Sequence, residues 1–304
     1  MKYLVVGAGG VGGMISAALA LSGADVAVIA RGAHLDAIKN NGLRIISDIF
    51  GDKTVEIPAF STDEYSDKPD VIFVCTKHYS LPDIIPFLQK VSDENTIVIP
   101  VLNVFQVGEE LQKSLVNTNV LEGCIYIVSF VSGTGVISHP SKIFKIFFGK
   151  RSNQKLSEEK LVLIQSDLTK AGIKAYNSDN ILRDTFAKVT LISPYAACGA
   201  FFDVPLANMQ KDGKERDFLI NLLTELSQIA DKLHLDLGFD VVQRNLDFVD
   251  KMPADTISSL HRDIKNNHKA EVDGQIFNIV RLGQKLGLEM SAYKLAAKKF
   301  GFEN

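Results

Sequence analysis

The fold is decided by residues 3–31, YLVVGAGGVGGMISAALALSGADVAVIAR. Residues 4–6 form a short apolar run that predicts a buried strand, and residues 15–21 carry small and apolar residues at helical spacing. Gly23 can end that helix, and residues 26–30 supply a second strand. The stretch therefore predicts a strand, a glycine-rich turn, a helix and another strand.

The glycine-rich turn has the spacing G-x-G-x-x-G. Gly7 allows a tight turn, Gly9 lets the backbone approach a pyrophosphate, and Gly12 lets the helix pack closely on the sheet. The first N–H groups of the helix would then face the phosphates. We therefore expect the turn to bind a dinucleotide; the alternative is a tight turn with a purely structural role. The expected cofactor-binding residues of the turn are Gly7, Ala8, Gly9, Gly10, Val11 and Gly12.

The residue after the second strand indicates which dinucleotide binds. An NAD site usually has Asp or Glu there, to accept the hydrogen bonds of the ribose 2′-hydroxyl. This chain has Arg31, whose guanidinium suits a 2′-phosphate. Asp25 precedes the strand and is badly placed to replace the missing acid. The sequence therefore favours NADP (NADPH) as cofactor, with an ordinary surface arginine as the alternative reading.

The composition of the chain limits which partners, metals and cellular locations are expected. The 304 residues carry a net charge of −3, which gives no reason to expect nucleic acid or an anionic membrane as partner. No run of apolar residues is long enough to span a membrane, and no signal-peptide pattern opens the chain. The three cysteines are widely spaced, and the six histidines lack metal-site spacing, so we expect no metal site, reduced thiols and a cytoplasmic location.

Alternating strand-like and helical stretches organise the first half of the chain. Such alternation predicts an α/β fold with a mostly parallel, Rossmann-type, doubly wound sheet. A turn or hairpin is expected over residues 129–140, which contain Gly133 and Gly135. Further strands are predicted at residues 71–75, 96–101, 120–128 and 143–148, and helices at 81–91, 109–115 and 158–171.

The second half of the chain changes character after about residue 178. Strand-like runs nearly vanish there and helical periodicity takes over. We therefore expect an NADP-binding Rossmann domain over residues 1–178 and an all-helical, substrate-binding and catalytic domain over residues 179–304. The helices are predicted at residues 181–201, 214–233, 239–249, 257–266 and 271–286.

Several short motifs then occur in a particular order. They are the glycine turn, Arg31, VCTK at 74–77, Asn103, RDTFAK at 183–188, SSLHRD at 258–263 and AEVDG at 270–274. Because these motifs occur in this order, the chain resembles the ketopantoate reductase (2-dehydropantoate 2-reductase) family over nearly its whole length. The resemblance implies NADPH-dependent reduction of a 2-keto acid, in a cleft between a Rossmann domain and a helical domain.

Lys188 is the candidate general acid. Ketone reduction needs a proton, or at least positive charge, at the carbonyl oxygen. Lys188 lies on an otherwise apolar helix beside Phe186 and Val189, which indicates a partly dehydrated ammonium. The alternative is a lysine that extends to solvent from the edge of a buried helix.

The resemblance also implies two residues on the substrate side. Glu271 matches an active-site carboxylate that holds the substrate hydroxyl and helps to orient the lysine, although an acid in a first helical turn can simply complement the helix dipole. Ser259 matches a residue that binds the substrate carboxylate, although it could be an ordinary helix serine. Asp273 is more simply interpreted as a capping or solvated charge.

Two residues belong to the cofactor side. Asn103 follows the fourth strand, where an amide can lie near the nicotinamide and the reacting carbonyl, so we expect it to contact both cofactor and substrate. Lys77 follows a strand and could reach the ribose or phosphates. The alternatives are a turn residue for Asn103 and a solvated strand-end charge for Lys77.

The chain departs from the family pattern at substrate-contacting positions. Val104 replaces the usual glycine after Asn103, and Ile192 and Ala196 replace asparagines that contact substrate. An apolar replacement favours a different or less polar ligand. Three hypotheses follow: reduction of ketopantoate to pantoate in pantothenate and coenzyme A biosynthesis, a paralogous reductase of a different 2-keto acid, and a non-catalytic NADP(H)-binding sensor. The expected partner is a small-molecule 2-keto acid, and a homodimer is compatible with the sequence.

Overall fold

The structure is a computed structural model that describes residues 1–152 and 154–303. Its internal contacts divide the chain into two compact units. Unit 1 comprises Met1–Leu102 and Gln106–Ile181, and unit 2 comprises Asn103–Phe105 and the chain from Leu182 onward. The division after residue 181 lies three residues beyond the boundary expected at 178, and the assignment of residues 103–105 to unit 2 was not expected.

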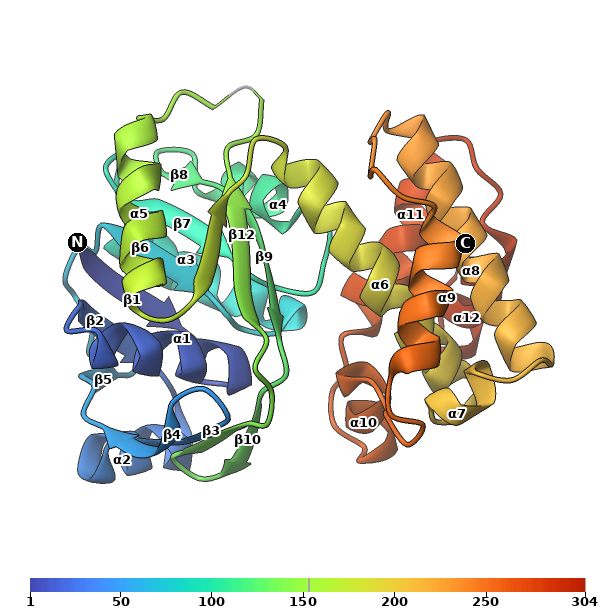
Figure 1. The fold of residues 1–304 in the computed structure, drawn as a ribbon. Helices are drawn as coiled ribbons and strands as arrows, with labels where there is room; N and C mark the ends of the chain where they lie inside the picture. Colours follow the sequence, from blue (N-terminus) through green and yellow to red (C-terminus); the bar gives the residue numbers. More distant parts are fainter. Residues whose placement is uncertain (153, 304) are drawn as a thin grey trace. The chain divides into compact units, whose positions relative to one another are not determined.

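Unit 1 is built on a six-stranded sheet of order β5-β2-β1-β6-β7-β8 (Figure 1). Every neighbouring pair in this sheet is parallel. Tyr3 to Val6 are buried, because a parallel sheet is covered on both faces. The sheet confirms the predicted Rossmann-type fold. Its strands are β1 (Lys2–Val6), β2 (Asp25–Ile29), β5 (Ala59–Phe60), β6 (Val71–Val74), β7 (Ile97–Pro100) and β8 (Asn119–Val120).

The helices of unit 1 alternate with its strands along the chain. The first of them, α1 (Gly10–Leu21), is buried over most of its length, because its small residues let it pack closely. An added Cβ at Gly13 would lie 2.7 Å from Ile137, which shows how close that packing is. The others are α2 (Gly32–Asn41), the short 3₁₀ turn η1 (His78–Ser80), α3 (Leu81–Val91), α4 (Val107–Ser114) and α5 (Glu158–Lys170).

The strands predicted at residues 120–128 and 143–148 lie mostly in a separate sheet. The stretch 120–128 divides into β8 and β9 (Glu122–Ile127), and β12 (Phe144–Gly149) pairs antiparallel with β9 and parallel with β13 (Lys174–Asn177). The prediction was wrong here because a parallel connection needs a long crossover, usually a helix. Residues 128–143 contain a hairpin instead, so β12 returns antiparallel to β9.

That hairpin was predicted, and the structure confirms it. β10 (Phe130–Gly133) and β11 (Val136–His139) pair antiparallel around Gly135, which has a φ of +74°. They belong to a four-stranded sheet of order β10-β11-β3-β4, with β3 (Leu43–Ser47) and β4 (Gly51–Val55). β3 was not predicted from the sequence; in the structure its residues alternate between buried and exposed, as in a half-buried strand.

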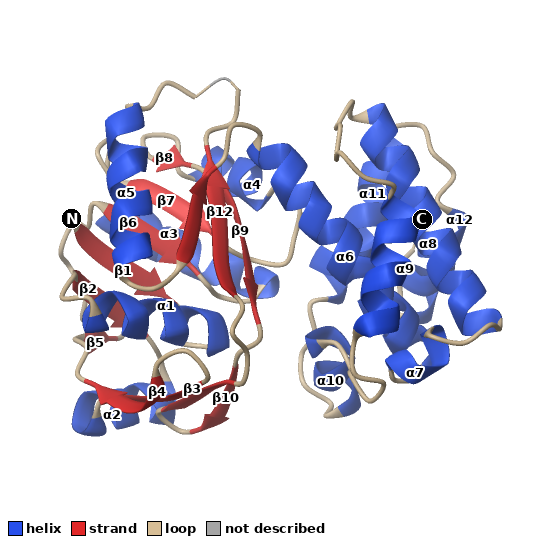
Figure 2. Ribbon diagram, in the orientation of Figure 1, coloured by secondary structure: helices blue, strands red, loops and turns tan. Residues whose placement is uncertain are grey.

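Among its described residues, unit 2 contains helices joined by turns and loops and no strand, as predicted (Figure 2). Leu222, Leu226 and Ile229 lie in its hydrophobic core. The helix expected over 271–286 differs in detail, because it begins with a π-helical turn. The elements are α6 (Ile181–Phe202), α7 (Leu206–Met209), α8 (Lys214–Lys232), α9 (Val241–Lys251), α10 (Ser259–Lys265), the π-helical η2 (Asp273–Phe277), α11 (Asn278–Lys285) and α12 (Ser291–Lys299). Across residues 1–152 and 154–303, no helix is both long and apolar enough to cross a membrane.

Candidate active site

The glycine turn in unit 1 has the backbone geometry that a dinucleotide site needs. Gly7 has a φ of +104°, where residues with a side chain are strained. A Cβ added at Gly12 would lie 2.0 Å from the carbonyl oxygen of Gly7, so only glycine fits there. A Cβ at Gly9 would meet no heavy atom within 4 Å, so the chain leaves open space beside that residue.

The same turn presents backbone donors. Within the described residues, the N–H groups of residues 8–12 have no acceptor, and the first turn of α1 contains no acidic residue. Free N–H groups at a helix N-terminus favour a phosphate group. The turn therefore fits the pyrophosphate of a nicotinamide dinucleotide.

Arg31 and Lys77 lie at the same edge of the parallel sheet as the turn. Arg31 comes directly before α2, shortly after β2 ends, and Lys77 comes directly before η1, shortly after β6 ends. Carboxyl ends of parallel strands share one edge, which is where ligands bind in such sheets. The Arg31 side chain is exposed, and no other described residue forms a hydrogen bond or ion pair with it.

Unit 2 brings two of the predicted site residues into direct contact. Lys188 Nζ donates a hydrogen bond of 2.7 Å to Asn103 Oδ1, although 85 residues separate them in the chain. The Lys188 side chain is 5% exposed. The ring of Phe105 packs edge-on against Phe186, with centroids 5.0 Å apart, and Asn278 Nδ2 donates to the Phe105 carbonyl at 3.3 Å. These contacts fix the segment that carries Asn103.

Glu271 lies just before the π-helical turn η2. Its side chain is 5% exposed, and Gln275 Nε2 approaches its Oε2 at 3.5 Å. Ser193 Oγ donates to the Gln275 carbonyl at 2.7 Å and accepts from the Tyr293 hydroxyl, also at 2.7 Å. Isolated π turns occur frequently at functional sites. This chain of hydrogen bonds holds the backbone that follows Glu271.

Sequence reasoning missed Gln275, Ser193 and Tyr293. The spacing of four residues between Glu271 and Gln275 is a helical neighbour pair and could have suggested their contact. Tyr293 lies in α12, which was not predicted, so no sequence signal linked it to Ser193.

The remaining substrate-side candidates differ in accessibility. Ser259 is half-buried at the first position of α10, while Ser258 caps that helix by accepting from His261 N at 3.0 Å. Ile192 is half-buried on α6. Ala196 is 1% exposed and belongs to the hydrophobic core of unit 2. The Ala196 methyl group therefore packs inside the unit rather than at its surface.

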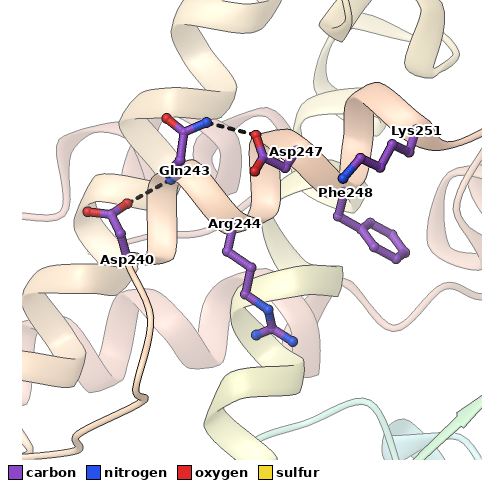
Figure 3. Close-up of a pocket in the computed structure, with 6 residues that line it drawn as sticks. All are labelled: Asp240, Gln243, Arg244, Asp247, Phe248 and Lys251. Atoms are coloured by element: carbon purple, nitrogen blue, oxygen red, sulfur yellow. Dashed lines mark hydrogen bonds between the residues drawn. The ribbon is translucent and has the colours of Figure 1, made fainter.

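An open hollow of about 440 Å³ lies along α9 (Figure 3). Asp240 accepts from Gln243 N, and Gln243 Nε2 donates to Asp247, both at 2.7 Å. The charged groups that line the hollow include Arg244 and Lys251, and none of the predicted site residues is among its lining. The hollow is therefore a surface feature of one helix and not the predicted site.

The fold and the site define the class of the protein: a nicotinamide-dependent oxidoreductase with a Rossmann-type unit and a helical unit. Within that class, the chain belongs to the ketopantoate reductase PanE/ApbA family. The family's N-terminal domain matches residues 3–153, and its C-terminal domain matches residues 180–300.

Individual relatives are distant. An uncharacterised oxidoreductase of Bacillus subtilis, YkpB, is 26% identical over 95% of this chain and 94% of its own length. The 2-dehydropantoate 2-reductase of Pyrococcus abyssi is 27% identical over 95% of this chain and 93% of its own length. A solved structure of D-mandelate dehydrogenase with NADH and anilino(oxo)acetate is 22% identical, covers 98% of this chain and 96% of its own, and has a TM-score of 0.85. At that identity, the structural likeness shows the fold alone.

Proposed function

We propose that this protein reduces a 2-keto acid with NADPH, and that its substrate is ketopantoate, which it converts to pantoate for pantothenate and coenzyme A biosynthesis in the cytoplasm. The observation that carries the proposal is the buried Lys188, held by a 2.7 Å hydrogen bond to Asn103 in a chain of this family. A reductase of this kind needs a proton donor placed by a fixed neighbour.

Lys188 is the proton donor in this proposal. The nicotinamide, when bound, supplies a hydride to the carbonyl carbon, which leaves negative charge on the oxygen. The Lys188 ammonium stabilises that charge and transfers a proton to the oxygen, which gives the alcohol and a neutral amine. Asn103 accepts from the ammonium and so fixes its direction before the reaction.

Glu271 and Ser259 complete the substrate side. Glu271 would accept a hydrogen bond from the substrate hydroxyl, and its backbone is held through Gln275, Ser193 and Tyr293. Ser259 would donate its hydroxyl to the substrate carboxylate. Its half-buried position at the start of α10 supports that role.

The cofactor assignment rests on unit 1. The open space at Gly9 and the unsatisfied N–H groups of residues 8–12 support pyrophosphate binding there. The exposed Arg31 supports a 2′-phosphate and therefore NADPH over NADH. Lys77 would contact the ribose or phosphates, and Asn103 would lie near the nicotinamide.

A different 2-keto acid is the second candidate substrate. Ile192 is half-buried one helical turn from Lys188 on α6, so this face of the helix is apolar there, while Ala196 two turns away lies in the core. An apolar wall gives no hydrogen bond to a hydroxyl group such as that of ketopantoate. A non-catalytic NADP(H) sensor is less well supported, because sensing requires neither Lys188 nor Glu271.

The test is an NADPH-oxidation assay with purified protein across ketopantoate and a panel of branched, linear and aromatic 2-keto acids. We expect the highest kcat/KM with ketopantoate. A higher value with another keto acid would replace the substrate assignment by the second candidate. Tight NADPH binding without oxidation by any keto acid would favour the sensor.

A further inference from the structure

His34 makes two hydrogen bonds that determine where its proton lies. His34 is the third residue of α2, and its Nδ1 lies 3.0 Å from the backbone nitrogen of Gly135, which can only donate. Nδ1 is therefore an acceptor without a proton. The proton is on Nε2, which donates to the carbonyl oxygen of Ala8 at 2.9 Å.

The two partners of His34 belong to parts of unit 1 that pack tightly together. A Cβ added at Gly135, in the hairpin turn, would lie 2.9 Å from the Cβ of Ala37 on α2. A Cβ at Gly10 would lie 2.5 Å from the carbonyl oxygen of Ser129, just before β10. The hairpin therefore contacts both α2 and the start of α1, and His34 joins it to the glycine turn.

The bond to Ala8 has a direct effect on the next N–H group. The carbonyl of Ala8 and the N–H of Gly9 belong to one planar trans peptide, so they point in opposite directions. By holding the Ala8 oxygen, His34 turns the Gly9 N–H the other way. That N–H has no acceptor among the described residues, and the space beside Gly9 is open.

We propose that His34 is a positioning residue that aims the Gly9 N–H at the pyrophosphate of the bound dinucleotide. The inference rests on the proposed dinucleotide binding but not on any particular keto acid. Because the pyrophosphate is common to both cofactors, His34 serves NADPH and NADH alike. Arg31 differs in this respect, since it would distinguish them by the 2′-phosphate.

The experiment measures the Kd of NADPH and of NADH by calorimetry, with the full chain and no keto acid present. His34→Ala should raise both Kd values about tenfold, the scale of one lost hydrogen bond. Arg31→Ala should raise the Kd of NADPH alone. Asp36→Ala, an exposed position on the same helix, should change neither value.

Two further variants separate positioning from general damage to the fold. His34→Asn keeps an acceptor for Gly135 but is too short to reach Ala8, so it should weaken both cofactors as His34→Ala does, without a lower Tm. His34→Gln can place an amide donor near Ala8 and should restore most of the affinity. Wild-type affinity in His34→Asn, or a loss confined to NADPH, would overturn the proposal.

The role of His34 in cofactor binding and the proposed keto acid reduction can be refuted independently of each other. Wild-type protein that binds NADPH but reduces no keto acid would refute the reaction and leave the His34 result intact. Wild-type protein that reduces ketopantoate while His34→Asn binds both cofactors normally would refute the role of His34 alone.

Discussion

In the Lys188–Asn103 contact, a buried ammonium group meets the neutral amide of a half-buried asparagine. A buried ammonium is costly unless its N–H groups find acceptors, and the Asn103 amide oxygen supplies one without neutralising the charge. A carboxylate in that position would stabilise the charged lysine and oppose release of its proton. The neutral Asn103 acceptor is compatible with the proton-donor role proposed for Lys188.

Replacement of Lys188 tests this role. Lys188→Ala should lower kcat at least about 100-fold, the usual scale for general acid catalysis, while the Kd of NADPH stays near the wild-type value. Steady-state kinetics and calorimetry measure the two quantities. Lys285→Ala, which removes an exposed lysine of unit 2, is the matched control and should leave kcat unchanged. Near-normal turnover in Lys188→Ala would show that another group donates the proton.

The helices α4 and α12 both begin without a capping side chain of their own. The residues before α4 and α12 are Gln106 and Met290, both with positive φ and neither with a capping hydrogen bond. Glu122 accepts from the N–H groups of Gly108 and Glu109, at 3.0 and 2.7 Å. The first N–H groups of α4 are thereby satisfied from β9, a neighbouring strand.

Glu225 on α8 does the same for α12. Its two carboxylate oxygens accept from Ala292 N at 2.6 Å and from Tyr293 N at 2.9 Å. Tyr293 in turn donates to Ser193, which holds the turn after Glu271. A cap between two helices therefore supports the backbone of a predicted site residue.

Glu225→Ala should lower the free energy of unfolding by about 1–2 kcal/mol, because it leaves two helix N–H groups without their acceptor. Urea unfolding followed by circular dichroism measures the loss. Glu289→Ala, an exposed acid near the start of α12, serves as the control and should change stability little. Equal effects in the two variants would refute the capping role.

His139 connects two of the sheets of unit 1. It lies on β11 and is fully buried; its Nδ1 is 2.9 Å from Ser47 Oγ on β3. Its Nε2 is 3.2 Å from the Ile143 carbonyl, just before β12. Ser47 Oγ also accepts from the N–H groups of Ile49 and Phe50, so its own proton goes to His139. Burial lowers the pKa of His139 below its ordinary value, which the Ile143 carbonyl only partly opposes.

This shift predicts a loss of stability in weak acid. Because the folded pKa lies below the unfolded one, the unfolded chain binds the proton first, and stability falls once the pH drops below 6.5. Well above pH 6.5, His139 is neutral in both the folded and the unfolded chain, so its titration does not change stability there. The free energy of unfolding should fall more steeply between pH 7 and about 5 in the wild type than in His139→Gln. The exposed His268→Gln should keep the wild-type slope. Parallel slopes in wild type and His139→Gln would contradict the assignment.

Much of the fold followed from short-range patterns. Buried runs, helical spacing and the glycines predicted the Rossmann-type sheet, the 129–140 hairpin and the helical second half, because these signals lie within a few residues of each other. The antiparallel pairing of β12 with β9 was not predicted, since an apolar run does not specify its neighbour. The helices α7 and α12 were missed for a similar reason: they are short and are held by contacts with distant residues.

The sequence by itself determined the strand, glycine turn, helix and strand of residues 3–31, the arginine that follows them, and the helical character of the second half. Local backbone preferences and hydrophobic periodicity are enough for these features. Only the tertiary structure decided that Asn103 receives the Lys188 hydrogen bond, that Gln275 and Tyr293 support the turn after Glu271, and that His34 holds the Ala8 carbonyl. Each of these depends on contacts, several of them between residues far apart in the chain, whose formation requires the packed core.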